Sequence, residues 1–413
     1  MKLESEWIQE DVVLENPLLK LSLRGLKYYG VLLHRSQPWK KLNCFRAIFF
    51  TISMFAFNIT QYVDLFQVWG NVSEMTANAS TTLLFTTTVV RVLHLYWNRA
   101  RFNAIIQKAD QVIRHILHQG TEEERQILNE NVVYMRRLTV GFWIFAMITA
   151  NTMCVYSLIQ YYGTQPTERS KWMHHPPTIL RSWYPSSNLV DHFAIVYGIQ
   201  LYIMCVGQLI VPCWHVFVVS LMVFVRTVLM ILNYKLSNLR LYEISVLRDD
   251  FPVWESKRCQ LRKKLLIQCT QLQCDIYDFT RELENLIKGA VLMDFLIFSV
   301  LLCALLFEAS VTASVVQVFI DVLYITTMTA ILFLYYWHAN KISYHANCLS
   351  KSVFSSDWYN YPRSVNRHLL MMICCNRKQL TMKAFFVSMS LDTFIAILRA
   401  SYSYFTILKQ AVD

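Results

Sequence analysis

The chain has 413 residues, of which 55% are hydrophobic, 14% are aromatic and 16% are charged. This composition is too apolar for an ordinary water-soluble domain and indicates a protein that crosses a membrane several times. The formal net charge is +11, but the basic residues gather in alternate connections between apolar segments. They therefore carry information about membrane orientation, and we expect no binding of nucleic acid.

Seven apolar segments are long enough to span a bilayer, which takes about 20 residues for ~30 Å of hydrocarbon. The predicted spans are residues 45–69, 75–97, 138–162, 189–225, 287–307, 315–337 and 384–408. The second is the weakest, because it is rich in threonine and contains Arg91. We expect no signal peptide, since residues 1–43 carry charges throughout. The prediction is an all-α fold in which residues 1–413 form a single seven-helix membrane domain.

The distribution of lysine and arginine sets the expected orientation. Residues 1–43, 98–137, 227–288 and 339–383 together contain 31 of them, whereas the alternate connections and the C-terminal tail contain four. Basic residues favour the cytoplasmic side, so we expect a cytoplasmic N-terminus and an extracellular C-terminus. Two glycosylation sequons, beginning at Asn71 and Asn78, lie at the first expected outer loop. All eleven cysteines fall in spans or expected cytoplasmic regions, where thiols stay reduced.

The expected cytoplasmic regions carry helical patterns of their own. Apolar residues recur with three-four spacing over residues 102–117 and 261–286, which is typical of amphipathic helices. We expect residues 227–288 and 339–383 to be cytoplasmic helical regions. The fourth span is uncharged over residues 193–225, which is too long for one upright crossing. It must therefore tilt, kink at Pro212 or protrude into the cytosol.

Four acidic or basic residues within the predicted spans are candidates for a functional role: Asp294, Asp321, Asp392 and Arg399. Charges are costly in hydrocarbon and often mark function there. A residue near the end of a span is equally well satisfied by backbone or solvent, and both interpretations stay open. Asp392 and Arg399 share one helical face but lie two turns apart, which is too far for direct pairing.

The sequence offers no catalytic or cofactor-binding pattern. No span carries His-x-x-x-His, and there is no glycine-rich phosphate loop and no obvious internal repeat. We therefore expect no enzymatic activity, no cofactor and no metal site. A G-protein-coupled receptor has the opposite orientation, and the last span here lacks the Asn-Pro-x-x-Tyr motif of such receptors. A metabotropic seven-helix receptor remains an alternative.

The C-terminal third resembles the insect odorant receptor family. The resemblance rests on six motifs, namely YYWHAN at residues 335–340, SKSVF at 350–354, DWY at 357–359, RHLLMM at 367–372, LDTF at 391–394 and SYSYF at 401–405. Gustatory receptors share the architecture but usually end with a Thr-Tyr pair, five apolar residues and Gln-Phe. Here Gln410 is retained and the threonine and phenylalanine are not, so a gustatory-type channel is the alternative. The loop at 227–288 is short for the odorant coreceptor, so the chain resembles a tuning subunit.

The resemblance implies the odorant-binding subunit of a ligand-gated, non-selective cation channel in the plasma membrane, expected in sensory-neuron dendrites. The implied partners are coreceptor subunits in a heterotetramer, a small volatile organic ligand, the lipid bilayer and permeant cations. The cytoplasmic helical regions would form the subunit contacts, and the last helix would line a central pore. Ile407 falls where the family places its narrowest constriction, with Gln410 beside it, and an apolar constriction gates by dewetting. Lys409 departs from what a cation pore favours.

A volatile ligand requires an apolar, aromatic-lined cavity, which we expect among the outer halves of the second to sixth helices. Shape and one or two hydrogen bonds must then supply selectivity. The candidate lining residues on the third and fourth spans are Asn151, Thr152, Tyr156, Tyr197, Gln200, Leu201 and Met204. Any of these side chains serves helix packing instead if it is turned away from the cavity.

Overall fold

The computed structural model describes residues 16–30, 40–164, 177–185, 189–242, 255–312, 314–377 and 379–412. The described part of the chain is almost entirely helical. Its elements are α2 (Lys20–Tyr29), α3 (Lys40–Gln67), α4 (Val72–Trp97), α5 (Arg99–Gln119), α6 (Glu122–Gly163), α8 (Phe193–Ser237), α10 (Glu255–Val311), α11 (Val315–Phe354), the 3-10 turn η2 (Trp358–Asn360), α12 (Arg363–Asn376), β1 (Lys383–Ala384), β2 (Val387–Ser388) and α13 (Leu391–Val412).

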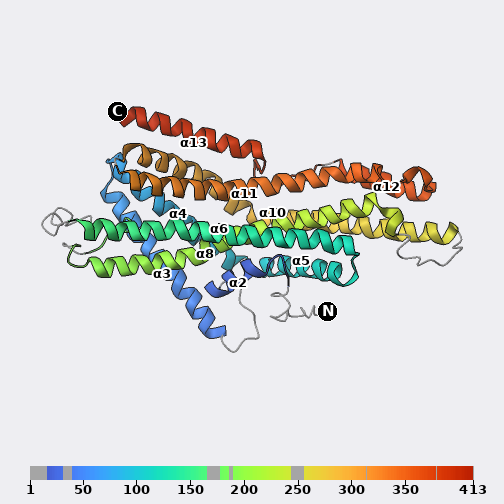
Figure 1. Ribbon diagram of the computed structural model, residues 1–413, viewed down its shortest axis with the longest axis horizontal. Helices are drawn as coiled ribbons and strands as arrows, with labels where there is room; N and C mark the ends of the chain where they lie inside the picture. The colour runs from blue at the N-terminus through green and yellow to red at the C-terminus, as the bar shows by residue number, and fades with distance from the viewer. Residues whose placement is uncertain are drawn as a thin grey trace.

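Four long helices, α6, α8, α10 and α11, run along the long axis of the molecule (Figure 1). The 45 residues of α8 measure about 68 Å at 1.5 Å per residue, roughly twice the ~30 Å hydrocarbon thickness of a bilayer. Pro212 lies inside α8, which continues to Ser237 as one helix. Of the three alternatives for the long fourth span, the structure therefore shows continuation past a single crossing. Residues 243–254 of the expected 227–288 region lie outside the described residues.

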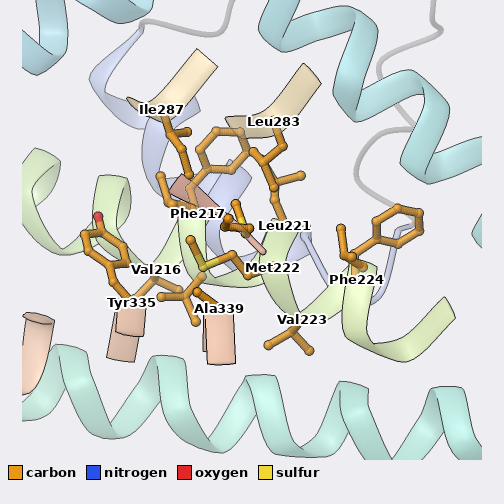
Figure 2. Close-up of a cluster of buried hydrophobic side chains, with 14 of the residues drawn as sticks. Val216, Phe217, Leu221, Met222, Val223, Phe224, Leu283, Ile287, Tyr335 and Ala339 are labelled. Carbon is orange, nitrogen blue, oxygen red and sulfur yellow. The ribbon is translucent and has the colours of Figure 1, made fainter. Parts of the chain in front are cut away.

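The centre of the bundle is α8, which contacts α2, α3, α4, α6, α10 and α11. Every residue of α8 from Pro212 to Val225 is buried, so this stretch turns no face toward the outside of the bundle. Figure 2 shows side chains of this stretch packed against α10 and α11; the labelled members are Val216, Phe217, Leu221, Met222, Val223, Phe224, Leu283, Ile287, Tyr335 and Ala339. Close packing also demands a glycine, since a Cβ on Gly25 of α2 would lie 2.1 Å from the Cys213 sulfur.

The expected amphipathic helix at residues 102–117 is α5, whose apolar stripe is buried. Phe102, for example, packs edge-to-face on Trp214 of α8, with ring centroids 6.0 Å apart. The stripe is therefore covered by protein.

Five described helices are long and apolar enough to cross a membrane, namely α3, α6, α8, α10 and α11. The other two expected spans coincide with α4 and α13, which are helices but do not reach that apolarity. In α4 the reason is a run of polar side chains that face protein: Asn78, Thr82, Thr87 and Arg91 are each 1% exposed or less. Asn78 donates to a carboxylate oxygen of Asp64 over 2.6 Å, so its sequon is inaccessible in the folded chain.

The last predicted span began too early. Residues 384–390 do not belong to α13, because β1 and β2 form an antiparallel hairpin that pairs Ala384 with Val387. Phe385 turns this hairpin with a φ of 57°, in the left-handed region that few side chains adopt. The helix then begins at Leu391, where the Ser390 hydroxyl accepts from the Thr393 amide over 3.4 Å, as an N-cap does.

Candidate functional site

Two neighbouring cavities lie among the helices near one end of the long axis. The larger, of about 440 Å³, is lined mostly by residues of α4, α6, α10, α11 and the segment 177–184. The smaller, of about 100 Å³, is lined by α3, α4, α6, α8, α11 and Leu180. Thr81, Met153 and Tyr324 line both, so only a shared wall separates them. We call them the outer cavity and the inner chamber.

The inner chamber is almost wholly apolar. Phe85 of α4, Met204 of α8 and Met328 of α11 are typical of its lining. Polar groups in the wall are already paired: the hydroxyls of Thr149 and Thr327 lie 3.1 Å apart. A ligand held there is therefore recognised chiefly by its shape and apolar surface.

The segment 177–184, which we call the roof, borders both cavities: Leu180 lines the inner chamber, and most of its other residues line the outer cavity. Leu180 is 1% exposed, and the Gln200 side chain of α8 clamps its backbone from both sides. The Gln200 carbonyl oxygen accepts from the Leu180 amide over 3.0 Å, and its amide donates to the Leu180 carbonyl over 2.7 Å. The Trp183 amide donates to the Thr60 carbonyl over 3.1 Å, which ties the roof to α3. A loop with its backbone groups satisfied in this way can be buried.

The outer cavity is polar and acidic. Asp64, Glu308 and Asp321 line it, together with Arg181. Asp321, one of the charges singled out in the sequence, is 3% exposed. One of its carboxylate oxygens accepts from Gln317 over 3.1 Å.

The predicted ligand-binding residues separate into three groups. Tyr156 lines the outer cavity and Met204 the inner chamber. Gln200 holds the roof, as described above. Of the remaining four, Tyr197 donates to the Cys154 carbonyl over 3.1 Å and Thr152 to the Ile148 carbonyl over 2.8 Å, while Asn151 and Leu201 are exposed on the outside of their helices.

Sequence reasoning expected the second and sixth spans at the cavity but named no residue on them; the lining residues of α4 and α11 include Thr81, Phe85 and Tyr324. The threonine-rich composition of α4 was the available signal, because polar side chains in a membrane helix turn toward protein or a cavity.

A buried ion pair joins α4 to α10 deeper in the bundle. Arg91 pairs with Asp294, and their side chains are 2% and 1% exposed. The guanidinium also lies 5.7 Å from the centre of the Phe298 ring, within reach of a cation–π attraction. Beside the pair, His215 Nδ1 of α8 lies 2.6 Å from the Tyr335 hydroxyl oxygen of α11. The charge in the weakest predicted span and the charge at Asp294 therefore pair with each other.

One face of α13 packs on the bundle and the opposite face is open. Ile397 and Ser401 are each 1% exposed, and the Ser401 hydroxyl donates to the Ser299 carbonyl of α10 over 3.1 Å. Ile407 is 62% exposed, and Gln410 is exposed three residues later. These two follow Asp392, Ala396, Arg399 and Ser403 at steps of three and four along the open face. Figure 1 shows α13 at the edge of the bundle, beside α11.

The sequence profile of the 7tm odorant receptor family matches residues 71–402. The chain belongs to this family. The receptor is 27% identical to odorant receptor 56a of Drosophila melanogaster over 407 residues, which cover 96% of each chain. It is 22% identical to odorant receptor Or2 of Anopheles gambiae, over 86% of this chain and 89% of that relative.

The fold is similar to that of the insect olfactory receptor OR5 from Machilis hrabei in complex with eugenol. The TM-score is 0.75 at 13% identity, and the match covers 95% of this receptor and 98% of OR5. A second structure of OR5 gives a TM-score of 0.68 at 14% identity, covering 94% and 98%. The receptor is thus a multi-pass plasma-membrane protein with the seven-helix fold of insect olfactory receptors, and odorant reception is its function.

Proposed function

We propose that this receptor is the odorant-binding, tuning subunit of a ligand-gated, non-selective cation channel assembled with coreceptor subunits. The observation that carries the proposal is the inner chamber, an apolar space between the helices that is bordered by Leu180 of the roof, which Gln200 holds. An apolar space of this kind removes hydrocarbon of a volatile ligand from water. The complex of the similarly folded OR5 with eugenol supports a small organic ligand as the occupant.

The pore is the role we assign to the open face of α13. Ile407 and Gln410 lie on this face, which the described residues leave uncovered. We place Ile407 at an apolar constriction, where dewetting blocks ion passage, and Gln410 next to it. Lys409 is exposed as well, and its positive charge favours a heteromer over a pore made of four copies of this chain.

The subunit contacts are the role we assign to the cytoplasmic helical regions, residues 227–288 and 339–383. In support, Leu370 and Met371 of α12 are 61% and 58% exposed. Figure 1 shows α12 at the end of the molecule opposite the C-terminus. Exposed apolar side chains outside the bilayer are typical of a surface that another chain covers. The membrane-crossing parts are those predicted from the sequence, with the last one starting at Leu391.

Ile407→Ala in the heteromer with coreceptor tests the pore assignment. A smaller side chain wets the constriction, so basal current should rise or the reversal potential with large organic cations should shift. The change should be small, because coreceptor subunits contribute the remaining gate residues.

The matched control is Thr406→Ala, one position away and about 100° around the helix. Thr406 is half-buried and donates to the Ser403 carbonyl over 2.8 Å. An effect of Thr406→Ala together with an unchanged Ile407→Ala channel contradicts the assignment.

A further inference from the structure

The outer cavity contains a buried carboxylate oxygen that has no partner. Asp321 is 3% exposed and lines this cavity. One of its oxygens accepts from Gln317, while Oδ2 has no hydrogen-bond partner. An ionised oxygen buried without a partner is costly, so the site favours a group that donates a hydrogen bond to it and carries positive charge.

The surroundings make the outer cavity electronegative. Glu308 at the end of α10 and Asp64 of α3 line the same space, and Asp64 already accepts from Asn78 over 2.6 Å. Arg181 is the one lysine or arginine among the lining residues. Its Nη1 lies 3.7 Å from Oε2 of Glu74, a residue outside the lining, so its charge is shared between Glu74 and the acids of the cavity. Among the described lining residues, three carboxyl groups thus face one shared guanidinium group.

The position of the inner chamber also indicates which kind of group accompanies the positive charge of the ligand. Tyr324 and Met153 line both cavities, so a molecule with its head beside Asp321 reaches the apolar inner chamber by displacing these two side chains. The rings of Tyr156 and Tyr324 in the outer lining offer a further attraction to a positive charge through their faces. The complementary ligand is therefore a small molecule with one cationic donor at the end of a hydrocarbon body.

Resting on the function proposed above, we propose that the outer cavity is an ammonium site and that this receptor responds to volatile primary amines in their protonated form. The ammonium group donates to Asp321 and Glu308, and the hydrocarbon body occupies the inner chamber. An alkylammonium ion has three N–H donors and, like a lysine side chain, is protonated at neutral pH. A neutral alcohol of the same shape fits the chamber equally but leaves the carboxylates without a counter-charge.

The test compares 2-phenylethylamine with 2-phenylethanol as probes, using currents from the receptor coexpressed with coreceptor. The expected result is an EC50 at least tenfold lower for the amine, since hydrogen bonds to charged groups are the strong ones. Asp321→Asn and Glu308→Gln should each raise the amine EC50 about tenfold or more and change the alcohol EC50 by less than about twofold. Asp191→Asn, an exposed acid that does not line the cavity, should change neither.

Equal potency of the two probes overturns the ammonium site, as do equal shifts of both probes in the Asn and Gln variants. A channel that neutral odorants open but amines do not also overturns the ammonium site. That result leaves the proposed function intact. If Asp321→Asn fails to reach the cell surface, Glu308→Gln decides, because Glu308 is partly exposed. A surface-expressed heteromer that answers neither probe nor a broad panel of neutral odorants contradicts the proposed function itself and the ammonium site with it.

Discussion

Replacing Gly207 with alanine should weaken activation by ligands that fill the inner chamber. Gly207 lies on α8 and lines the chamber. A Cβ at this position would lie 3.7 Å from the nearest atom of the Phe85 ring, an ordinary van der Waals distance, so the added methyl group fits without moving the protein. It takes its space from the ligand.

The expected size follows from the apolar surface that the methyl group displaces. Excluding one methylene-sized part of the ligand loses about 0.8 kcal/mol, which is about fourfold in affinity. Gly207→Val excludes more and should raise the EC50 by more than about tenfold. Ligands that are small enough to leave this part of the chamber empty should be unaffected.

The assay is the concentration dependence of odorant-evoked current in the heteromer, with surface labelling to confirm equal expression. Gly198→Ala is the matched control, because Gly198 is on the same helix and a Cβ there meets nothing within 4 Å. Both substitutions gain similar helix propensity, up to about 1 kcal/mol, so neither should lose folded protein. Equal EC50 values for Gly207→Val and Gly198→Ala with every chamber-filling ligand would refute the placement of the ligand in this chamber.

Three further predictions concern the support of the site and the cytoplasmic region. Arg91→Met leaves the buried Asp294 carboxylate without its counter-charge, which costs about 3–5 kcal/mol of folding free energy. Surface expression should therefore fall strongly, and the double variant with Asp294→Leu should recover part of it. Wild-type surface expression of Arg91→Met would argue against a stabilising role of the pair. Gln200→Leu releases the roof at Leu180, so current should decay faster after odorant washout, and an unchanged decay argues against a clamping role. Burial and two nearby basic side chains lower the pKa of His345 to about 4, so its neutral form is the stable one in the fold. Thermal stability of the purified heteromer should therefore be full above about pH 6.5 and fall toward pH 4, with a shallower fall in His345→Gln; identical pH profiles contradict this.

Helix positions were predictable because long apolar or amphipathic periods report directly on burial. The burial of α5 was read from its three-four spacing, and the length of α8 from its uncharged run. The hairpin before α13 was not predictable, since residues 384–387 are as apolar as a membrane span. What distinguishes this segment from a membrane span is the turn at Phe385, which has a positive φ. No local sequence feature predicts that conformation for a phenylalanine.

The cavities were predictable in their location but not in their lining. The outer halves of the third and fourth spans do contribute Tyr156 and Met204. Neighbouring helix positions point about 100° apart, so which residues face inward depends on helix rotation. In α8, which is apolar all round, no polar face reveals that rotation, and Leu201 was placed inward although it is 40% exposed. The charge pair between Arg91 and Asp294 depends on contact between helices far apart in the chain, which a single sequence does not encode locally.

The most direct test of this receptor as a channel subunit is an odorant-evoked current recorded while G-protein signalling is blocked. Cells expressing the receptor with its coreceptor should show a non-selective cation current of undiminished size and onset under the block. Cells expressing the receptor alone should show little or no current. Loss of the response under the block would mean that the seven helices signal metabotropically, and robust currents from this chain alone would contradict the tuning-subunit assignment.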